Sequence, residues 1–316
     1  MSAATAITAV NASVERYRDA ERILWNHYGL EPTERFVEVS SPAARLRVVE
    51  VGSGPPVLLV PGTGGTGPYW GALVRELSKH FRCVMLDRPG WGLSAPLDYS
   101  SVEYGTVVAD LLRGVLDALE LDRADVAGAS IGDVWALRLA SRHPGRVRRV
   151  VLLGGGPIAA DIAAPGVIRV IASPIGAIMV RLPQKPGRVR AFIRQAGHGA
   201  SLAAGRIPDE YIQWRVAFDR ETDSMRNERD MVRTIVSWRK GLRPELTFDD
   251  AELAAIQQPT LLLYGTADPV GTPESWKRAM DLLPRGELQL VDGAGHMPWL
   301  DDPSGVAEHV SRFLAT

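Results

Sequence analysis

The stretch GASIG at residues 128–132 contains the side chain best suited to chemistry in this sequence. A strand-like apolar run precedes it and a helix-like run follows it, so the hydroxyl of Ser130 would stand on a tight turn at a strand's end. The glycines on either side would relieve crowding around a serine in an unusual backbone geometry. Two interpretations are open: Ser130 is a nucleophile, or it only caps the helix that begins at Ile131.

A nucleophilic serine needs two partners. Its hydroxyl is a weak nucleophile until a base removes the proton. A histidine, whose unperturbed pKa is about 6.5, can take and return that proton near neutral pH. A carboxylate fixes the imidazole tautomer and stabilises the imidazolium. The helix that begins at Ile131 would also direct its free N–H groups and its positive dipole end toward Ser130.

A glycine-rich loop offers a second chemistry. Gly62, Gly64 and Gly67 match G-x-G-x-x-G between a strand and a helix, and Asp87 ends the next strand, as in a dinucleotide-binding fingerprint. However, Pro68 favours the first helical turn, so Gly67 should still lie in the loop. Asp87 also leads directly into the tight turn RPGWG. These features favour the other use of such a loop, in which exposed backbone N–H groups stabilise an oxyanion.

The elements that would position these residues alternate along the chain. Apolar runs predict strands at residues 35–39, 46–51, 56–60, 82–86, 124–128, 147–153, 260–264 and 288–291. Helical spacing predicts helices at residues 13–29, 102–119, 131–142, 273–283 and 303–314. Continuous apolar strands are typical of strands covered on both faces. The alternation predicts an α/β fold with a mostly parallel, eight-stranded type of sheet and helices on both faces.

Residues 157–244 interrupt this alternation. They carry 15 Lys and Arg against 8 Asp and Glu, whereas the whole chain has a net charge of −1. This shift predicts an inserted helical cap over 157–244, a core made of 35–156 and 245–316, and an N-terminal helical extension over 1–34. The basic residues either form a solvated helical surface or attract an anionic group of the substrate. The cap's aliphatic residues favour an apolar substrate or a packed cap core; they are Val167, Ile168, Ile171, Ile175, Ile178, Met179 and Val180.

The totals limit the compartment and the partners. The chain has 316 residues, of which 46% are apolar, so it can bury a sizeable core, and its charge gives no sign of a nucleic-acid partner. The single cysteine, Cys83, cannot build a disulfide framework, which favours a reducing, cytoplasmic location. The N-terminus does not read as a signal peptide. The most apolar segment, 166–182, contains Arg169 and Pro174 and falls short of the ~20 residues that span a bilayer, so stable membrane insertion is not expected.

The motif at 128–132 resembles the nucleophile elbow of the α/β-hydrolase family. The resemblance covers about residues 36–314, excluding the cap. In that family the serine is followed along the chain by an acid and then by a histidine. The resemblance therefore assigns Ser130 as the nucleophile, Asp268 as the acid and His296 as the base, each just after a predicted strand.

The alternatives for the two partners are structural. Asp268 could be a turn residue before a proline, a frequent pattern. The family's other acid position, after the strand at 147–153, is a run of three glycines at 154–156 and offers no carboxylate. His296 lies in a glycine-rich loop with no helical or strand period. The other histidines fit the role of base less well, because they lie in terminal helices, at helix ends or in the cap; they are His27, His309, His80, His143 and His198.

The resemblance also implies an oxyanion hole made of two backbone N–H groups. One would come from Ile131 and the other from Thr63, with Gly64 as the nearest alternative. This chain has Pro61 where the family often has a histidine. Substrate contacts are expected from the same loop and from the residue after the base, that is, from Gly62, Gly64 and Met297.

Asp133 stands where many members of the family have glycine. A carboxylate in the first turn of a helix suits the helix dipole, with a stabilisation of ~0.3–1 kcal/mol. We therefore expect Asp133 to be at least partly solvated. A buried carboxylate would instead crowd the helix against the sheet or raise the histidine pKa.

The resemblance implies a serine hydrolase that cleaves a carboxylic ester or related acyl bond of a small, apolar substrate through an acyl-enzyme. No cofactor is implied, and no His, Cys and Asp spacing supports a metal site. A serine nucleophile argues against the dehalogenase and epoxide-hydrolase relatives, which use aspartate. A carbon–carbon bond hydrolase, a perhydrolase or a lyase with the same triad remains open, as does a non-catalytic ligand-binding relative. The sequence does not assign an oligomeric state.

Overall fold

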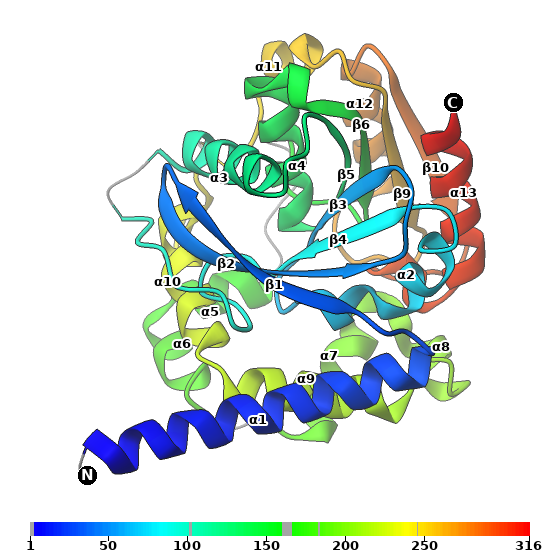
Figure 1. Cartoon of the computed structure of the whole chain (residues 1–316). Helices are drawn as coiled ribbons and strands as arrows, with labels where there is room; N and C mark the ends of the chain where they lie inside the picture. Colours follow the sequence, from blue (N-terminus) through cyan, green and yellow to red (C-terminus); the bar gives the residue numbers. More distant parts are fainter. Residues whose placement is uncertain (1–2, 101–102, 160–165, 183, 245) are drawn as a thin grey trace.

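A single eight-stranded sheet forms the centre of the molecule, in the order β1-β2-β4-β3-β5-β6-β9-β10 (Figure 1). The computed structural model describes residues 3–100, 103–159, 166–182, 184–244 and 246–316. Strand β2 runs antiparallel to both β1 and β4, and the remaining neighbours pair in parallel. Helices flank this sheet, so the predicted α/β fold class is confirmed.

The strands of the sheet are β1 (Thr33–Ser40), β2 (Ala43–Val51), β3 (Pro56–Val60), β4 (Arg82–Leu86), β5 (Ala124–Ala129), β6 (Val147–Leu153), β9 (Thr260–Gly265) and β10 (Gly286–Val291). The helices around it are α1 (Ala3–Tyr28), α2 (Gly71–Leu77), α3 (Tyr104–Ala118), α4 (Ile131–Arg142), α11 (Asp250–Ala255), α12 (Pro273–Leu282) and α13 (Pro303–Ala315). Every predicted strand is present, and the differences lie at the strand ends. Strand β10 starts earlier than expected because Gly286 pairs with Thr260 of β9. Residue 102, where one helix was expected to begin, lies outside the described residues.

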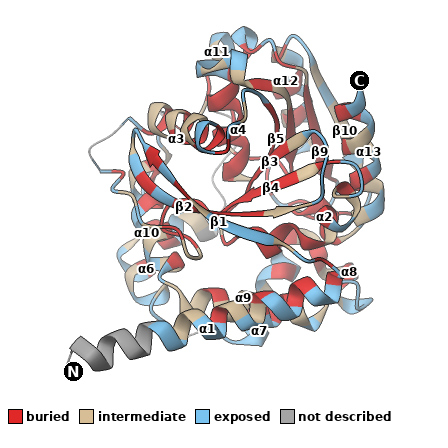
Figure 2. Cartoon of the chain, in the orientation of Figure 1, coloured by how far each residue is buried: buried red, intermediate tan, exposed pale blue. Residues whose placement is uncertain are grey.

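Alternate side chains of the central strands enter two different cores. Val57 and Leu59 of β3 pack with α2 and α13, whereas Leu58 and Val60 pack with α3 and α4. All four side chains are fully buried, and Figure 2 shows the buried interior of the sheet. Burial on both faces explains why this strand has no polar alternation.

In the described residues between β6 and α11, the chain forms six helices and one short hairpin. They are α5 (Gly166–Ala172), α6 (Pro174–Met179), α7 (Pro186–Ile193), α8 (Gly199–Ala203), α9 (Asp209–Glu221), α10 (Ser224–Ile235), β7 (Val236–Ser237) and β8 (Gly241–Leu242), with the irregular turn η3 (Arg194–His198) between α7 and α8. We call this group the insertion. Figure 1 shows its helices grouped together beside one end of the sheet.

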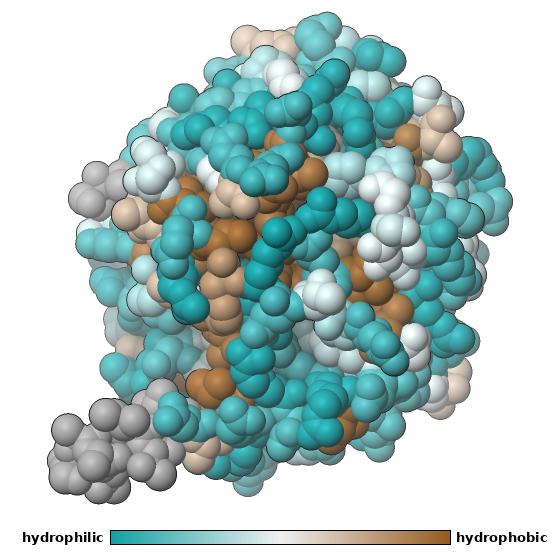
Figure 3. Space-filling view, viewed as in Figure 1, coloured by the Kyte–Doolittle hydropathy of each residue, from teal (hydrophilic) through white to brown (hydrophobic). Residues whose placement is uncertain are grey.

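Part of the insertion's apolar surface faces outward. Ile175 and Ile178 are both 65% exposed and Met179 is 44% exposed, whereas Ile171 is buried. A buried substrate pocket and a packed cap core, the two roles expected of this segment's aliphatic residues, would both cover these side chains, and the structure leaves the three of them exposed. The face drawn in Figure 3 is mostly hydrophilic, with apolar residues in small groups. In the described part of the chain, no helix combines the length and the apolar character needed to cross a bilayer.

Helix α1 is longer than the expected 13–29 and packs against the insertion. It runs beside α9 in Figure 1, and its Tyr17 and Leu24 are fully buried. The hydroxyl of Tyr17 hydrogen-bonds the hydroxyl of Thr66, 2.8 Å away, in the glycine-rich loop. Helix α1 is thus joined to the insertion on one side and to a candidate functional loop on the other.

Candidate active site

Ser130 occupies a strained turn between β5 and α4. Its φ is 53° and its ψ is −120°, a conformation that L-residues rarely adopt. The flanking glycines permit this turn, because a Cβ added to Gly132 would lie 2.0 Å from the Val60 carbonyl oxygen and one added to Gly128 would lie 2.5 Å from the Gly132 carbonyl carbon. The Ser130 side chain makes no capping hydrogen bond to α4. The hydroxyl of Ser130 is therefore not used to cap the helix.

His296 and Asp268 form a hydrogen-bonded pair. The Nδ1 atom of His296 lies 2.8 Å from Oδ2 of Asp268, whose side chain is fully buried. The other oxygen, Oδ1, accepts a hydrogen bond from the Val270 N–H at 2.8 Å, so Asp268 also has the turn role that the sequence allowed. The Nε2 atom of His296 bonds no partner within the described ranges, and the side chain keeps 17% of its exposure. This nitrogen is free to exchange a proton.

The glycine run at 154–156 lies against both the Ser130 turn and the His296 loop. A Cβ added to Gly154 would lie 1.6 Å from the His296 carbonyl oxygen, and one added to Gly156 would lie 1.9 Å from the Ser130 carbonyl oxygen. The Ser130 N–H also donates to the Leu153 carbonyl at 3.3 Å. The glycines thus serve close packing, and they bring residues far apart in the sequence to one end of β6.

The glycine-rich loop covers the other side of the serine. A Cβ added to Gly62 would lie 2.9 Å from Ser130 Cβ. The backbone N–H groups of Thr63, Gly64 and Ile131 donate to no acceptor within the described residues. These three backbone donors include both members of the predicted oxyanion hole, Thr63 and Ile131.

Two residues of the insertion hold this loop. The Thr63 hydroxyl donates to Glu228 of α10 at 2.9 Å, and Arg215 of α9 donates to the Gly64 carbonyl oxygen. Glu228 also pairs with the buried guanidinium of Arg88 at 3.4 Å. Burial raises the pKa of Glu228, although Arg88 and the Thr63 hydroxyl oppose the rise. Sequence reasoning missed Arg215 and Glu228, because among many charged residues of this segment nothing marks these two.

Tyr69 is a further neighbour of the serine that the sequence did not reveal. Its hydroxyl oxygen lies 3.4 Å from the position that a Gly62 Cβ would take, on the same side as Ser130. The residue is 4% exposed, and its hydroxyl has no hydrogen-bond partner within the described ranges. Burial raises the pKa of Tyr69 well above its ordinary value, so the hydroxyl keeps its proton and can donate it in a hydrogen bond.

Asp133 is fully buried, so the expectation that it is at least partly solvated is wrong. Its carboxylate accepts hydrogen bonds from the N–H of Gly156 at 2.7 Å and of Leu153 at 3.3 Å. These donors come from the end of β6, which a sequence pattern around residue 133 cannot show. Burial, and to a smaller extent the nearby charge of Asp268, raise the pKa of Asp133 well above its ordinary value.

The carboxylate of Asp87 is held inside the fold. It lies 3.2 Å from Arg47 and accepts a hydrogen bond from the Gly67 N–H at 3.2 Å. Burial raises its pKa to about 6, with Arg47 opposing the rise. Gly67 begins the short helix η1 (Gly67–Trp70), with Pro68 in its first turn. Asp87, the acidic residue of the dinucleotide-like pattern, thus connects the glycine-rich loop to Arg47 of β2 and to the end of β4.

Met297, a predicted substrate contact, is 4% exposed. Its sulfur accepts a hydrogen bond from the Tyr211 hydroxyl of α9 at 3.9 Å, and its N–H donates to His198. The residue after the base is therefore packed against the insertion.

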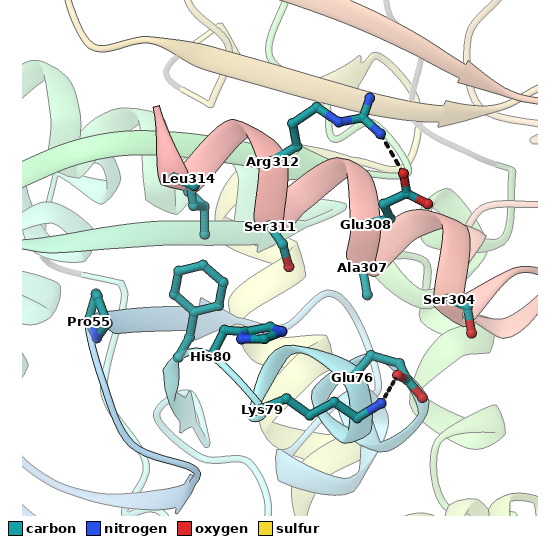
Figure 4. Close-up of a pocket in the computed structure, with 12 residues that line it drawn as sticks. Pro55, Glu76, Lys79, His80, Ser304, Ala307, Glu308, Ser311, Arg312 and Leu314 are labelled. Atoms are coloured by element: carbon teal, nitrogen blue, oxygen red, sulfur yellow. Dashed lines mark hydrogen bonds and ion pairs between the residues drawn. The ribbon is translucent and has the colours of Figure 1, made fainter.

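A separate hollow of about 810 Å³ lies between α2 and α13 (Figure 4). Its charged side chains are paired with each other, Lys79 with Glu76 and Arg312 with Glu308. None of the candidate catalytic residues lines it. Among the residues that the structure describes, no cluster of three or more His, Cys, Asp or Glu side chains could hold a metal ion.

Comparison with known proteins agrees with the fold. Residues 55–303 match the family model described as alpha/beta hydrolase fold. The chain belongs to this family. It is 30% identical over 273 residues to a 2-hydroxy-6-oxo-2,4-heptadienoate hydrolase of Pseudomonas putida, a match that covers 84% of this chain and 91% of the relative.

Two other matches extend the range of relatives. A pimeloyl-[acyl-carrier protein] methyl ester esterase of Nitrosospira multiformis is 27% identical, with 85% of this chain and 97% of the relative covered. The crystal structure of naproxen esterase (carboxylesterase NP) from Bacillus subtilis has a TM-score of 0.72 at 20% identity, and the match covers 95% of this chain and 97% of that one. At that identity the structural match shows the fold alone. The family relatives thus include hydrolases named for ester and for dienoate substrates.

Proposed function

We propose that this protein is a serine hydrolase that cleaves a carboxylic ester, or a related acyl bond, of a small molecule through an acyl-enzyme. The observation that carries the proposal is the packing of the Ser130 turn and the His296 loop on the glycines at 154–156, with Asp268 bonded to the histidine. This combination supplies a nucleophile, a base with a free nitrogen and an orienting acid at one end of the sheet.

In the proposed reaction, Ser130 Oγ attacks the carbonyl carbon of the substrate while His296 Nε2 takes the hydroxyl proton. The N–H groups of Thr63 and Ile131 donate to the oxyanion of the tetrahedral intermediate. His296 then returns the proton to the leaving alcohol as the carbon–oxygen bond breaks. Water, deprotonated by the same imidazole, releases the acid product and restores the serine. Asp268 keeps the imidazole in the tautomer that presents Nε2 to the serine.

The direct test uses a short p-nitrophenyl ester and a fluorophosphonate probe. The wild-type protein should turn over the ester and be labelled at Ser130. The variant Ser130→Ala should lose labelling, and its kcat should fall by about 10⁴ to 10⁶. Ser304→Ala, a change at an exposed serine of α13 that lines the separate hollow, is the matched hydroxyl-deletion control and should keep both properties. Ester turnover that survives in Ser130→Ala at the wild-type rate would reject the proposal.

A second candidate is carbon–carbon bond hydrolysis by the same residues. It is favoured by the 30% identity to a hydrolase named for 2-hydroxy-6-oxo-2,4-heptadienoate, an anionic substrate. Against it, the guanidiniums nearest the loop are already matched, Arg88 by Glu228 and Arg215 by Asp219. We therefore prefer an uncharged acyl substrate. Comparing kcat/KM for this dienoate with that for a p-nitrophenyl ester decides between them, and a ratio in favour of the dienoate would select the second candidate.

A further inference from the structure

A second histidine–carboxylate pair, His198 with Asp301, contacts the loop that carries His296. His198 of the insertion is fully buried, and its Nδ1 atom lies 2.6 Å from Oδ2 of Asp301. Its Nε2 atom accepts a hydrogen bond from the Met297 N–H at 3.1 Å. Because Nε2 accepts, the ring proton must sit on Nδ1 and point at Asp301. The tautomer is therefore set by contacts on both sides of the ring.

The same segment of the insertion touches the loops of both proposed triad partners. The His296 N–H donates to the Ala196 carbonyl oxygen at 2.8 Å. Gly197 has a φ of 93°, and a Cβ added there would lie 2.4 Å from the Ala267 carbonyl oxygen and 2.8 Å from the Gly295 Cα. The insertion thus lies in direct contact with the residues just before Asp268 and just before His296, and it accepts hydrogen bonds from two consecutive backbone N–H groups of the base loop, those of His296 and Met297.

Asp301 does not depend on His198 alone. It also accepts hydrogen bonds from the Ser201 hydroxyl and from the Gly295 N–H, the latter at 2.8 Å. Burial acts to raise the pKa of Asp301, but these hydrogen bonds and the one from His198 hold it below its ordinary value. By contrast, Met297 N–H has His198 Nε2 as its only acceptor within the described residues. What His198 alone supplies is therefore an acceptor for the amide next to the base.

We propose that His198 is a positioning residue, which fixes the His296 imidazole by accepting the Met297 N–H and so couples the insertion to catalysis. The inference deepens the proposed function and depends on His296 acting as the base. If the acceptor is lost, a buried N–H remains unpaired and the loop shifts to find a partner. A shift of about 1 Å at a catalytic group can lower kcat about 100-fold.

Two variants separate the two ring nitrogens. In His198→Gln the side-chain oxygen can reach the position of Nε2 and still accept from Met297, whereas in His198→Asn the amide nitrogen can replace Nδ1 and only the bond to Asp301 survives. We expect His198→Gln to keep kcat within about threefold of wild type and His198→Asn to lose about 10- to 100-fold, with KM changed little in both. His143→Gln, at another histidine paired with an aspartate (Asp110, 2.8 Å), is the control and should keep full activity.

A measurement that does not require turnover accompanies the kinetics. Amide hydrogen exchange of Met297 should be slow in the wild type and in His198→Gln and faster in His198→Asn, at equal Tm of the two variants. Equal exchange and equal kcat in the two variants, whether both are active or both are impaired, would overturn the inference. A wild-type protein that neither hydrolyses esters nor labels at Ser130 would reject the proposed function instead, and the exchange result would still decide whether His198 holds the Met297 N–H.

Discussion

Two of the histidine–aspartate pairs in the described residues, His296 with Asp268 and His198 with Asp301, differ in what the second ring nitrogen contacts. In the pair of His296 and Asp268, Nε2 is free and the imidazole keeps 17% of its exposure. In the pair of His198 and Asp301, the imidazole is fully buried and Nε2 already accepts a backbone N–H. The same two residue types thus leave one ring nitrogen available for the proposed proton transfer and engage the other with a backbone N–H. The partner of the second ring nitrogen, and not the carboxylate, separates the two roles.

The largest difference in kcat should appear when the same substitution, histidine to glutamine, is made at His296 and at His198. His296→Gln keeps a polar side chain but cannot act as a base, so kcat on a p-nitrophenyl ester should fall by about 10⁴ to 10⁶. His198→Gln should cost less than about threefold, as argued above. Steady-state kinetics on both variants checks the contrast. If the two substitutions lowered kcat by similar factors, the functional difference between the pairs would be refuted.

A smaller difference in kcat is expected between the amide substitutions of the two aspartates, Asp268 and Asp301. Asp268→Asn should lower kcat about 10⁴-fold, because an amide in that position favours the wrong imidazole tautomer. Asp301→Asn should lower it less than about tenfold, because the remaining oxygen can still accept one of the several hydrogen bonds made there. Turnover of both variants is measured on one ester, with the fluorophosphonate labelling rate of Ser130 as a second readout. A loss in Asp301→Asn as large as that in Asp268→Asn would contradict the assignment of roles.

The smallest effect concerns another buried carboxylate, Asp133, whose pKa the charge of Asp268 helps to raise and which, among the described residues, bonds only backbone N–H groups. Burial raises its pKa in the folded state, so above the unfolded pKa of about 4 the folded protein holds more protons than the unfolded one. The wild type's free energy of unfolding should therefore fall relative to that of Asp133→Asn as pH rises from about 4 toward the folded pKa, by at most about 1.4 kcal/mol per pH unit.

Urea unfolding of both proteins at pH 5, 6, 7 and 8 measures this difference. Asp281→Asn, an exposed carboxylate on α12, is the control for the loss of one acid. Parallel pH curves for wild type and Asp133→Asn would show that the buried carboxylate is as readily ionised in the folded as in the unfolded state.

Features that depend on local contacts could be predicted from the sequence, whereas features that depend on distant contacts could not. The strand at 56–60 and the helix at 131–142 were predicted with their bounds, because apolar runs, glycines and prolines act locally. The long helix α1 was predicted too short at its N-terminal end. The sequence around residue 133 indicated a solvated cap position, and the error arose because the donors to Asp133 lie about 20 residues further along the chain.

By itself, the sequence determined the order of the elements and the chemical types at their ends: a serine between glycines, an acid after one strand and a histidine after another. Only the tertiary structure decided which further residues meet them. The glycines at 154–156 supply no carboxylate, yet Gly154 packs against the backbone of His296 and Gly156 against the backbone of Ser130. Nothing in the sequence distinguishes His198 from other histidines; its contact with the Met297 N–H, 99 positions away, is visible only in the structure. Patterns record local preferences, whereas a hydrogen bond between distant segments exists only once the sheet and its helices have packed.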